Sequence, residues 1–475
     1  TFFKLNYSGK KGGEKACIVL YDVIDRQKKY DEKKIKKQVG EIINACSFSI
    51  IKNRLFHLIL DTLRSYYPGT LPGFSVQQMI EKAKILQEKQ LAEPAWKLIR
   101  KAKQSALINE LFPEALQTLK MERKIIEFLD SEIYEKLIAR NLEEEKSVIE
   151  KHNNLTGYAH LQSKMFTIYR ANIVARNKRV IAFFKKMLKH PLLQNESAAL
   201  SFGAKYHFYI IKSDCCRYLG DLKKSYEHVQ KLIALFESVP MLSHKIIMYL
   251  NTLQQKVGIQ SLRGKLNDSM QSIRKIRDIG KSYPQFAKII PPNLPFRSAM
   301  IETDLCLRIP DYETGVAQIP RIEAELKKIG NVLPKHIEYT LYNNIALLYF
   351  GTKDYHKALD WINKLLNENK DEYALDLICG ARILFLIIHI ELGNDDLLEY
   401  AAQSTHRYLT TRKRKYKVEG IFLDLLKILL NPHRKKDLPK IYPQMLVKFK
   451  KLKDDPYEKG AFEFFDYISW LESKI

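Results

Sequence analysis

Apolar residues recur every three or four positions along most of the chain, a spacing that places them on one face of an α-helix. The clearest case is the stretch 339–367, where two such faces flank the turn Gly351-Thr352-Lys353-Asp354. The first face consists of Tyr342, Ile345, Ala346 and Tyr349, and the second of Tyr355, Ala358, Ile362 and Leu365. Small Ala346 and Ala358 let two helices approach closely. The pattern therefore predicts an antiparallel helical hairpin.

The same turn followed by an amphipathic helix appears several times. The residues that begin the helix after the turn are Leu222, Leu266, Tyr312, Tyr355 and Asp395, in steps of roughly 40 to 46 residues. A weaker turn is expected at Lys89-Gln90-Leu91. A regular step in this range is typical of an α-α superhelical solenoid, in which stacked hairpins bury one continuous core. We therefore predict an all-α protein.

The residues of the best hairpin resemble the tetratricopeptide repeat (TPR) family. Its large, small and aromatic positions are matched by Tyr342, Ile345, Ala346, Tyr349, Ala358, Ile362 and Leu365. The resemblance extends over about 76 to 405, with a step longer than the 34 residues of the family. The array is also similar to irregular TPR-like solenoids of bacterial regulators and to uncharacterised TPR proteins of Bacteroidetes. The resemblance implies protein or peptide binding without catalysis.

Helices are also expected outside the array. The segment 67–73 contains two Pro-Gly pairs and predicts a boundary near residue 70. The chain is therefore divided into N-terminal helices at 1–70, a TPR-like array at 76–405, and basic C-terminal helices with a cap at 406–475. Within the array, 142–169 is expected to form one long helix. The aromatic residues of 457–471 predict a final capping helix.

Charge and cysteine content narrow the possible partners and compartment. The chain contains 79 Lys and Arg and 54 Asp and Glu, which gives a net charge of +25. This charge favours anionic partners or reflects a lysine-rich solvated surface. The six cysteines show no paired spacing, so neither a disulfide framework nor a zinc site is indicated. No apolar run is long enough to predict a transmembrane segment. We expect a cytoplasmic protein, although the chain begins at Thr1 without Met, which leaves a removed targeting segment open.

Catalytic signatures are missing from the sequence. It contains no GxGxxG, GxxxxGK[ST], HExxH or GxSxG motif and no EF-hand loop. His152 and His160 share a helical face but have no acidic or cysteine partner in register, so no metal site is expected. We predict neither enzymatic activity nor a cofactor.

Two surfaces are candidate binding sites. The first is the concave groove, where TPR proteins usually bind with first-helix residues. The polar residues that the register places there are Asn251, Gln254, Gln255, Arg297, Asn343 and Asn344. Asn side chains can bond the backbone of an extended peptide. The next hairpin puts Ile383, Leu384 and Ile387 at these positions, which predicts either an apolar groove segment or a shift of register.

The second surface is the basic region 403–453, where fifteen Lys and Arg face three acidic residues, a net charge of +12. Its anion-binding candidates are Arg412, Lys413, Arg414, Lys415, Lys417, Arg434, Lys435 and Lys436. Tyr416 interleaves with them, as a base-stacking residue in a phosphate-binding surface would. Alternatives are a solvated helix end and a surface for an acidic protein. A peptide-binding scaffold is thus the first hypothesis, and a protein that binds nucleic acid or another anionic surface is the second.

Overall fold

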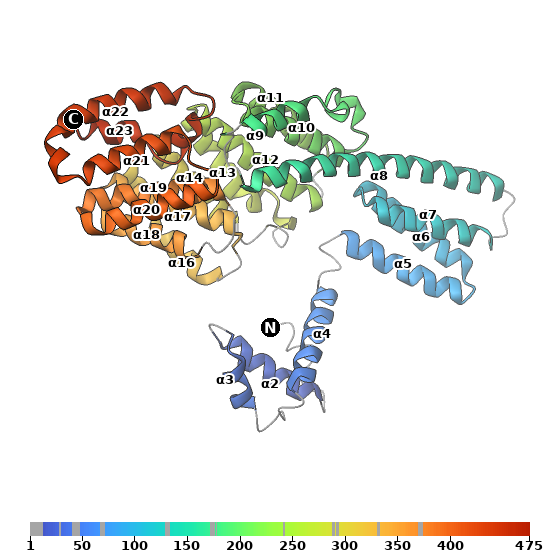
Figure 1. The fold of residues 1–475 in the computed structure, drawn as a ribbon. Helices are drawn as coiled ribbons and strands as arrows, with labels where there is room; N and C mark the ends of the chain where they lie inside the picture. Colours follow the sequence, from blue (N-terminus) through green and yellow to red (C-terminus); the bar gives the residue numbers. More distant parts are fainter. Residues whose placement is uncertain are drawn as a thin grey trace. The chain divides into compact units, whose positions relative to one another are not determined.

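The computed structural model describes residues 13–27, 30–39, 48–66, 72–128, 134–171, 176, 178–240, 243–286, 290, 294–329, 333–368 and 374–475 (Figure 1). The secondary structure of these residues is entirely helical. The chain forms two compact units, Thr1–Val148 and Ile149–Ile475, called unit 1 and unit 2 below. The predicted all-α fold is confirmed.

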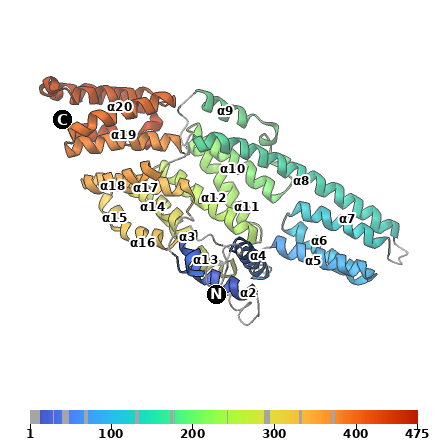
Figure 2. The same cartoon turned by 60° about the horizontal axis from the view of Figure 1, so that its bottom comes forward.

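The first described helices of unit 1 are α2 (Gly13–Asp25), α3 (Glu32–Val39) and α4 (Phe48–Tyr66). They pack around a small apolar core whose buried members are Cys17, Leu20, Ile35, Val39, Phe48 and Leu55. Antiparallel helices follow, α5 (Pro72–Glu88), α6 (Ala92–Ile108) and α7 (Phe112–Ile126), which lie side by side in Figures 1 and 2. The turn predicted near Gln90 separates α5 from α6. The boundary predicted near residue 70 lies outside the described residues.

The long helix α8 (Tyr134–Ala171) begins in unit 1 and continues into unit 2. It starts eight residues before the helix predicted from residue 142. In unit 1 it is held by charge as well as by apolar contact. The Lys103 ammonium lies 2.6 Å from the carboxylates of both Glu122 and Glu144, and Asn141 donates a hydrogen bond to Glu122.

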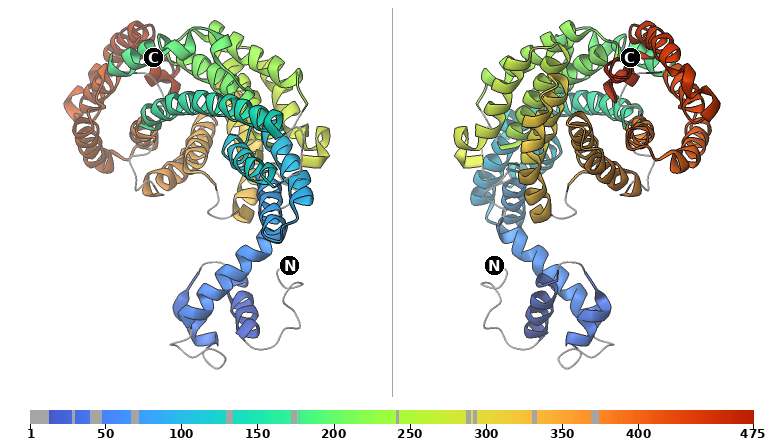
Figure 3. Two further views of the ribbon diagram at one scale, coloured as in Figure 1. Left: turned by 90° about the vertical axis from the view of Figure 1, so that its right-hand side faces the viewer. Right: turned by 90° about the vertical axis from the view of Figure 1, so that its left-hand side faces the viewer.

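Unit 2 is a stack of helical hairpins preceded by α9 (Lys178–Leu188). Short 3-10 turns, η1 (Pro191–Leu193) and η2 (Glu196–Ala198), lead into the stack, and η3 (Pro284–Phe286) follows its second hairpin. The successive hairpins are α10 (Phe202–Tyr218) with α11 (Leu222–Glu237), α12 (Ser243–Leu262) with α13 (Leu266–Ser282), α14 (Leu294–Arg308) with α15 (Tyr312–Ala317) and α16 (Ile319–Ile329), α17 (Lys335–Gly351) with α18 (Tyr355–Glu368), and α19 (Leu375–Leu392) with α20 (Asp395–Thr411). Figure 3 shows the helices of unit 2 following one another around a curve. The predicted superhelical solenoid is confirmed.

One turn geometry repeats in these hairpins. The residue before each second helix donates its N–H to the carbonyl five residues earlier, as Asp221 does to Cys216 and Asp354 to Tyr349, at 2.9 Å in both cases. This bond closes a helix C-terminus when the residue before it adopts a left-handed conformation, which glycine adopts at little cost. Gly220, Gly264 and Gly393 occupy that position with φ between 70° and 86°. The turn therefore explains why the predicted helix starts are those observed.

The C-terminal part of unit 2 contains one more hairpin, α21 (Lys417–Leu429) and α22 (Leu438–Lys453), linked by η5 (Pro432–Asp437). The predicted capping helix over 457–471 is wrong in form, because the segment folds as a 3-10 turn, η6 (Lys459–Glu463), and a short helix, α23 (Tyr467–Glu472). Asp466 separates them by accepting hydrogen bonds from the N–H groups of Ile468 and Ser469. In Figure 1, α23 lies between α22 and α21.

The core of unit 2 consists of two apolar clusters, one around α9–α13 and one that continues from α14 through α23. Of the helices in the described part of the chain, none is both long and apolar enough to cross a membrane.

Candidate functional site

The first helices of the hairpins in unit 2 share a face that can be defined by position. We number the residues of each first helix backwards from the residue that precedes the second helix of the same hairpin, so that position 7 lies seven residues before that residue. Positions 14, 11, 7 and 4 or 3 then fall on one side of the first helix, because a helix turns once in 3.6 residues. We call this surface of α10, α12, α14, α17 and α19 the first-helix face. Four of the predicted groove residues, Asn251, Gln254, Arg297 and Asn343, occupy these positions.

At position 14, neighbouring helices are joined by polar side chains. The Arg297 guanidinium of α14 donates a 2.7 Å hydrogen bond to the Asn251 side-chain oxygen of α12. Arg297 is half-buried, and its burial lowers the pKa of the guanidinium. It nevertheless stays protonated at neutral pH. No carboxylate of the described residues forms an ion pair with Arg297, so its charge is uncompensated locally.

Two glutamines on α12 continue this polar surface. Gln255, at position 10, donates hydrogen bonds to the Ser213 hydroxyl at 3.3 Å and to the Asp214 carboxylate of α10 at 2.9 Å. Gln254, at position 11, has a shielded amide nitrogen that makes no hydrogen bond to any described residue. The side-chain oxygen of Gln255 is also shielded and accepts no hydrogen bond from a described residue. Both atoms are shielded from solvent, so a ligand reaches them only when the two side chains turn.

Position 7 shows how much room this part of the face leaves. On α12 the position is Gly258, and a Cβ atom built there would meet nothing within 4 Å. On either side stand Asp214 and Asp304, and Asp304 accepts a 3.4 Å hydrogen bond from Ser261 of α12. We call the part of the face formed by α10, α12 and α14 the polar part.

Two of the predicted groove residues, Asn343 on the first-helix face and Asn344 beside it, do not behave as expected. Asn343 and Asn344 on α17 are buried, with 4% and 6% of their surface exposed. Asn344 lies at position 10 and donates hydrogen bonds to the Met300 carbonyl and to the Thr303 hydroxyl of α14. Its amide therefore joins two neighbouring helices. The expectation that these two asparagines face a groove is corrected.

The remaining helices, α17 and α19, give the face an apolar character. Position 7 is Leu347 on α17 and Ile387 on α19, and position 11 on α19 is Ile383. Ile383 and Ile387 are 1% and 0% exposed, although their positions match those of Gln254 and Gly258. Ile383, Leu384 and Ile387 are therefore core residues and do not form an open apolar groove segment. We call α17 and α19 the apolar part of the face.

Some of the basic candidate residues pack against other side chains of the protein, and others are exposed to solvent. The buried Arg414 pairs with Asp376 at 3.0 Å, so it belongs to the core and not to an anion site. Arg412 lies over the Tyr408 ring at 4.2 Å. Tyr416 is covered by the Arg176 guanidinium 4.3 Å from its ring centroid, which corrects the expectation that it stacks on a base.

Other cations of the basic region reach solvent. Lys413, Lys415, Lys417, Arg434 and Lys436 are exposed, Lys417 lies 3.5 Å from Asp455, and Arg434 lies 3.9 Å from Asp437. The side chain of Lys435 lies outside the described residues. The sequence candidates omitted α22, where Lys440, Lys448 and Lys451 are spaced along one exposed side and make no ion pair with a described residue. Their helical spacing was the signal that could have identified them.

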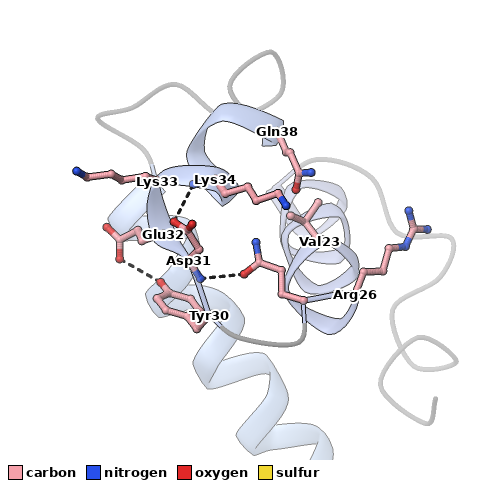
Figure 4. A pocket seen from close by; sticks show the side chains of 9 residues that line it. Val23, Arg26, Tyr30, Asp31, Glu32, Lys33, Lys34 and Gln38 are labelled. Atoms are coloured by element: carbon pink, nitrogen blue, oxygen red, sulfur yellow. Dashed lines mark hydrogen bonds between the residues drawn. The ribbon is translucent and has the colours of Figure 1, made fainter.

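An open depression between α2 and α3 in unit 1 is a third place to examine (Figure 4). Its polar groups bond locally. The Asp31 N–H donates to Gln27 at 3.0 Å, the Asp31 carboxylate accepts from the Lys34 N–H at 3.1 Å, and Tyr30 donates to Glu32 at 3.0 Å. These bonds begin helix α3 and offer no converging groups to a ligand.

Comparison with known proteins adds no functional assignment. No protein-family model matches the chain, and a search of curated proteins found no match either. Among solved structures, the chain matches one in the crystal structure of the APC/C hetero-tetramer Cut9-Hcn1, with 11% identity, a TM-score of 0.28, and coverage of 90% of this chain and 98% of that one. A similarity of this size carries no argument about function.

Proposed function

We propose that the protein is a non-catalytic scaffold that binds a peptide segment on the polar part of the first-helix face. Stacked helical hairpins use their concave surface for such binding. The observation that carries the proposal is the open space at Gly258, on a helix whose neighbouring face positions carry the amide side chains of Gln254 and Gln255. An extended peptide supplies backbone N–H and C=O groups that match the amides.

Arg297 indicates the charge of the peptide. A half-buried guanidinium without a carboxylate partner among the described residues favours an anionic ligand, since a charge-assisted bond offsets its desolvation. Asn251 fixes the direction of this guanidinium by accepting its hydrogen bond. We therefore propose that the bound segment contains an acidic residue placed near Arg297.

A blocking substitution tests the proposal in the full-length protein. Peptides are selected from a random display library, and their affinities are measured by fluorescence polarisation. Gly258→Leu fills the open space and improves helix propensity by about 0.8 kcal/mol, so it should abolish binding without loss of stability. Arg297→Met should weaken binding of acidic peptides only. Lys223→Leu, on the exposed side of α11, is the matched control. Peptides that bind Gly258→Leu as well as the unaltered protein would refute the site.

The exposed lysines of α22 support a second candidate function, the binding of nucleic acid through the C-terminal region. Lys440, Lys448 and Lys451 follow one side of a helix, as groups that contact successive phosphates would. The test is the salt dependence of affinity for single-stranded RNA and duplex DNA. A steep loss of affinity with salt, reduced by charge reversal at the three lysines, is expected. A salt-independent absence of binding at low ionic strength would exclude it.

A further inference from the structure

The chain's own C-terminal segment lies across the first helices of unit 2. Its start is near the turn after α10, because a Cβ atom on Gly220 would lie 2.9 Å from the Lys459 ammonium. Glu463 then pairs with Arg308 at the end of α14, at 2.9 Å. At the other end, Glu391 of α19 accepts a 2.8 Å hydrogen bond from the Trp470 indole and a 2.9 Å bond from Lys474. The segment 459–475 therefore runs along the C-terminal ends of α10, α14 and α19.

Its aromatic side chains fit the apolar part of the face. Phe465 packs against Phe350 of α17, at position 4, with ring centroids 5.4 Å apart. Phe464 covers Gly380 of α19, where an added Cβ atom would lie 2.8 Å from the Phe464 Cβ atom. Gly380 holds position 14, which in α12 and α14 is occupied by the polar Asn251 and Arg297. The face therefore carries no side chain at the place that Phe464 occupies.

The segment contacts the face through side chains only. Among the described residues, the backbone hydrogen bonds of 459–475 are local, for example from Ala461 to Glu458 and from Trp470 to Asp466. Opening it would break apolar contacts and a few polar side-chain bonds, but no backbone bond to α10–α19.

A firm anchor stands immediately before the segment. The buried Glu458 accepts hydrogen bonds from the Arg176 guanidinium at 3.2 Å and from the N–H groups of Lys417 and Val418, both at 3.1 Å. Arg176 also pairs with both oxygens of Glu419. The chain is therefore fixed at Glu458 by polar bonds, whereas the residues beyond it are held by apolar side chains, among them Tyr467 stacked on Phe449 of α22.

We propose that residues 459–475 are an internal ligand of the first-helix face. The segment occupies the apolar part, opens from it without global unfolding of unit 2, and thereby controls access of a partner segment of the same chemistry. That partner is a peptide with neighbouring aromatic side chains flanked by acidic residues, like Glu463-Phe464-Phe465-Asp466. This inference concerns the apolar part and does not depend on peptide binding to the polar part.

The test compares two glycine substitutions in the full-length protein. Gly380→Ala places a methyl group against Phe464, whereas Gly258→Ala meets nothing, and both gain helix propensity. Hydrogen exchange of 459–475, measured by mass spectrometry, should accelerate about tenfold or more in Gly380→Ala while α10–α12 remain unchanged, because the segment opens as a local unit. Gly258→Ala should exchange like the unaltered protein.

A binding measurement completes the test. A labelled peptide with the sequence of 459–475 should bind Gly380→Ala, and also Glu391→Ala, which removes the acceptor of the Trp470 and Lys474 bonds. It should bind neither the unaltered protein nor Gly258→Ala, and the peptide with Phe464→Ala and Phe465→Ala should bind none of them. Exchange that accelerates throughout unit 2 would overturn the proposal, because the segment would then be part of the cooperative core. The proposal would also be overturned if the peptide bound neither of the two opened variants.

Discussion

The polar and apolar parts of the first-helix face have the same backbone arrangement but carry different side chains at equivalent positions. Position 7 is open at Gly258 on α12 and closed at Ile387 on α19. Position 14 is the polar Arg297 on α14 and the bare Gly380 on α19. The hairpin geometry is common to both parts, so the difference arises from a few side chains and from the C-terminal segment. Repetition of a fold therefore does not imply repetition of a binding surface.

The largest expected effect comes from the anchor of the apolar part. Arg176→Met leaves Glu419 and Glu458 buried without their cation, which should cost about 3–5 kcal/mol of unfolding free energy. Chemical denaturation of the variant measures this loss, and Arg407→Met, at an exposed position on α20, is the control. A loss below about 1 kcal/mol, the usual value for a surface pair, would show that the network does not hold this end of the array together.

The next effect concerns the covered position on α19. Ile387→Ala should lower the free energy of unfolding by about 2–5 kcal/mol, because it removes fully buried methyl groups and leaves a cavity. Leu397→Ala on α20 is the matched control, since Leu397 is 60% exposed and should change stability by less than about 0.5 kcal/mol. Similar losses for the two variants, measured in urea, would contradict the burial of this part of the face.

A pH effect is expected at the start of the polar part. Burial lowers the pKa of His207, at position 14 of α10, to about 4, below the ordinary value of 6.5. Between pH 6.5 and 4 the unfolded chain therefore binds a proton that the folded chain does not. This contribution to stability is level above pH 6.5 and falls below it, by about 1–2 kcal/mol after allowance for solvent screening. His207→Gln should flatten that part of the stability–pH curve, and an unchanged curve would exclude His207 as its source.

The smallest effect separates the two glycines. Gly258→Ala should raise the free energy of unfolding by about 0.5–1 kcal/mol, because it gains helix propensity in open space. Gly380→Ala has the same intrinsic gain but should lower stability through its contact with Phe464. Thermal unfolding of the two variants measures the difference. Equal changes in stability would mean that Phe464 does not cover Gly380.

Local sequence signals predicted the hairpins well. Glycine in a left-handed turn residue and a helical apolar stripe are properties of neighbouring residues, so the helix starts at Leu222, Leu266 and Asp395 could be predicted. The equivalent positions of Asn251 and Arg297 on α12 and α14 follow from the same register. Because these signals act over one or two turns of helix, they do not depend on distant parts of the chain.

The remaining features depend on residues far apart in sequence. Arg176 meets Glu419, Arg414 meets Asp376, and Asn344 meets Thr303, and no local pattern specifies such pairs. The return of 459–475 across the array is of the same kind. One signal was available, because isoleucines at positions that are polar in other hairpins require a cover. The sequence alone did not show that the C-terminal segment packs against α17 and α19.

Thiol labelling at position 7 tests the division of the face most directly. Gly258→Cys and Ile387→Cys place a thiol at equivalent positions of α12 and α19, and the described native cysteines are all buried. Labelling of the folded protein with a maleimide, followed by mass spectrometry, gives the rate at each site. The account predicts labelling of Cys at 258 near the rate of a free thiol and labelling at 387 slower by about tenfold or more, through opening of the segment. Equal rates at the two positions would contradict it.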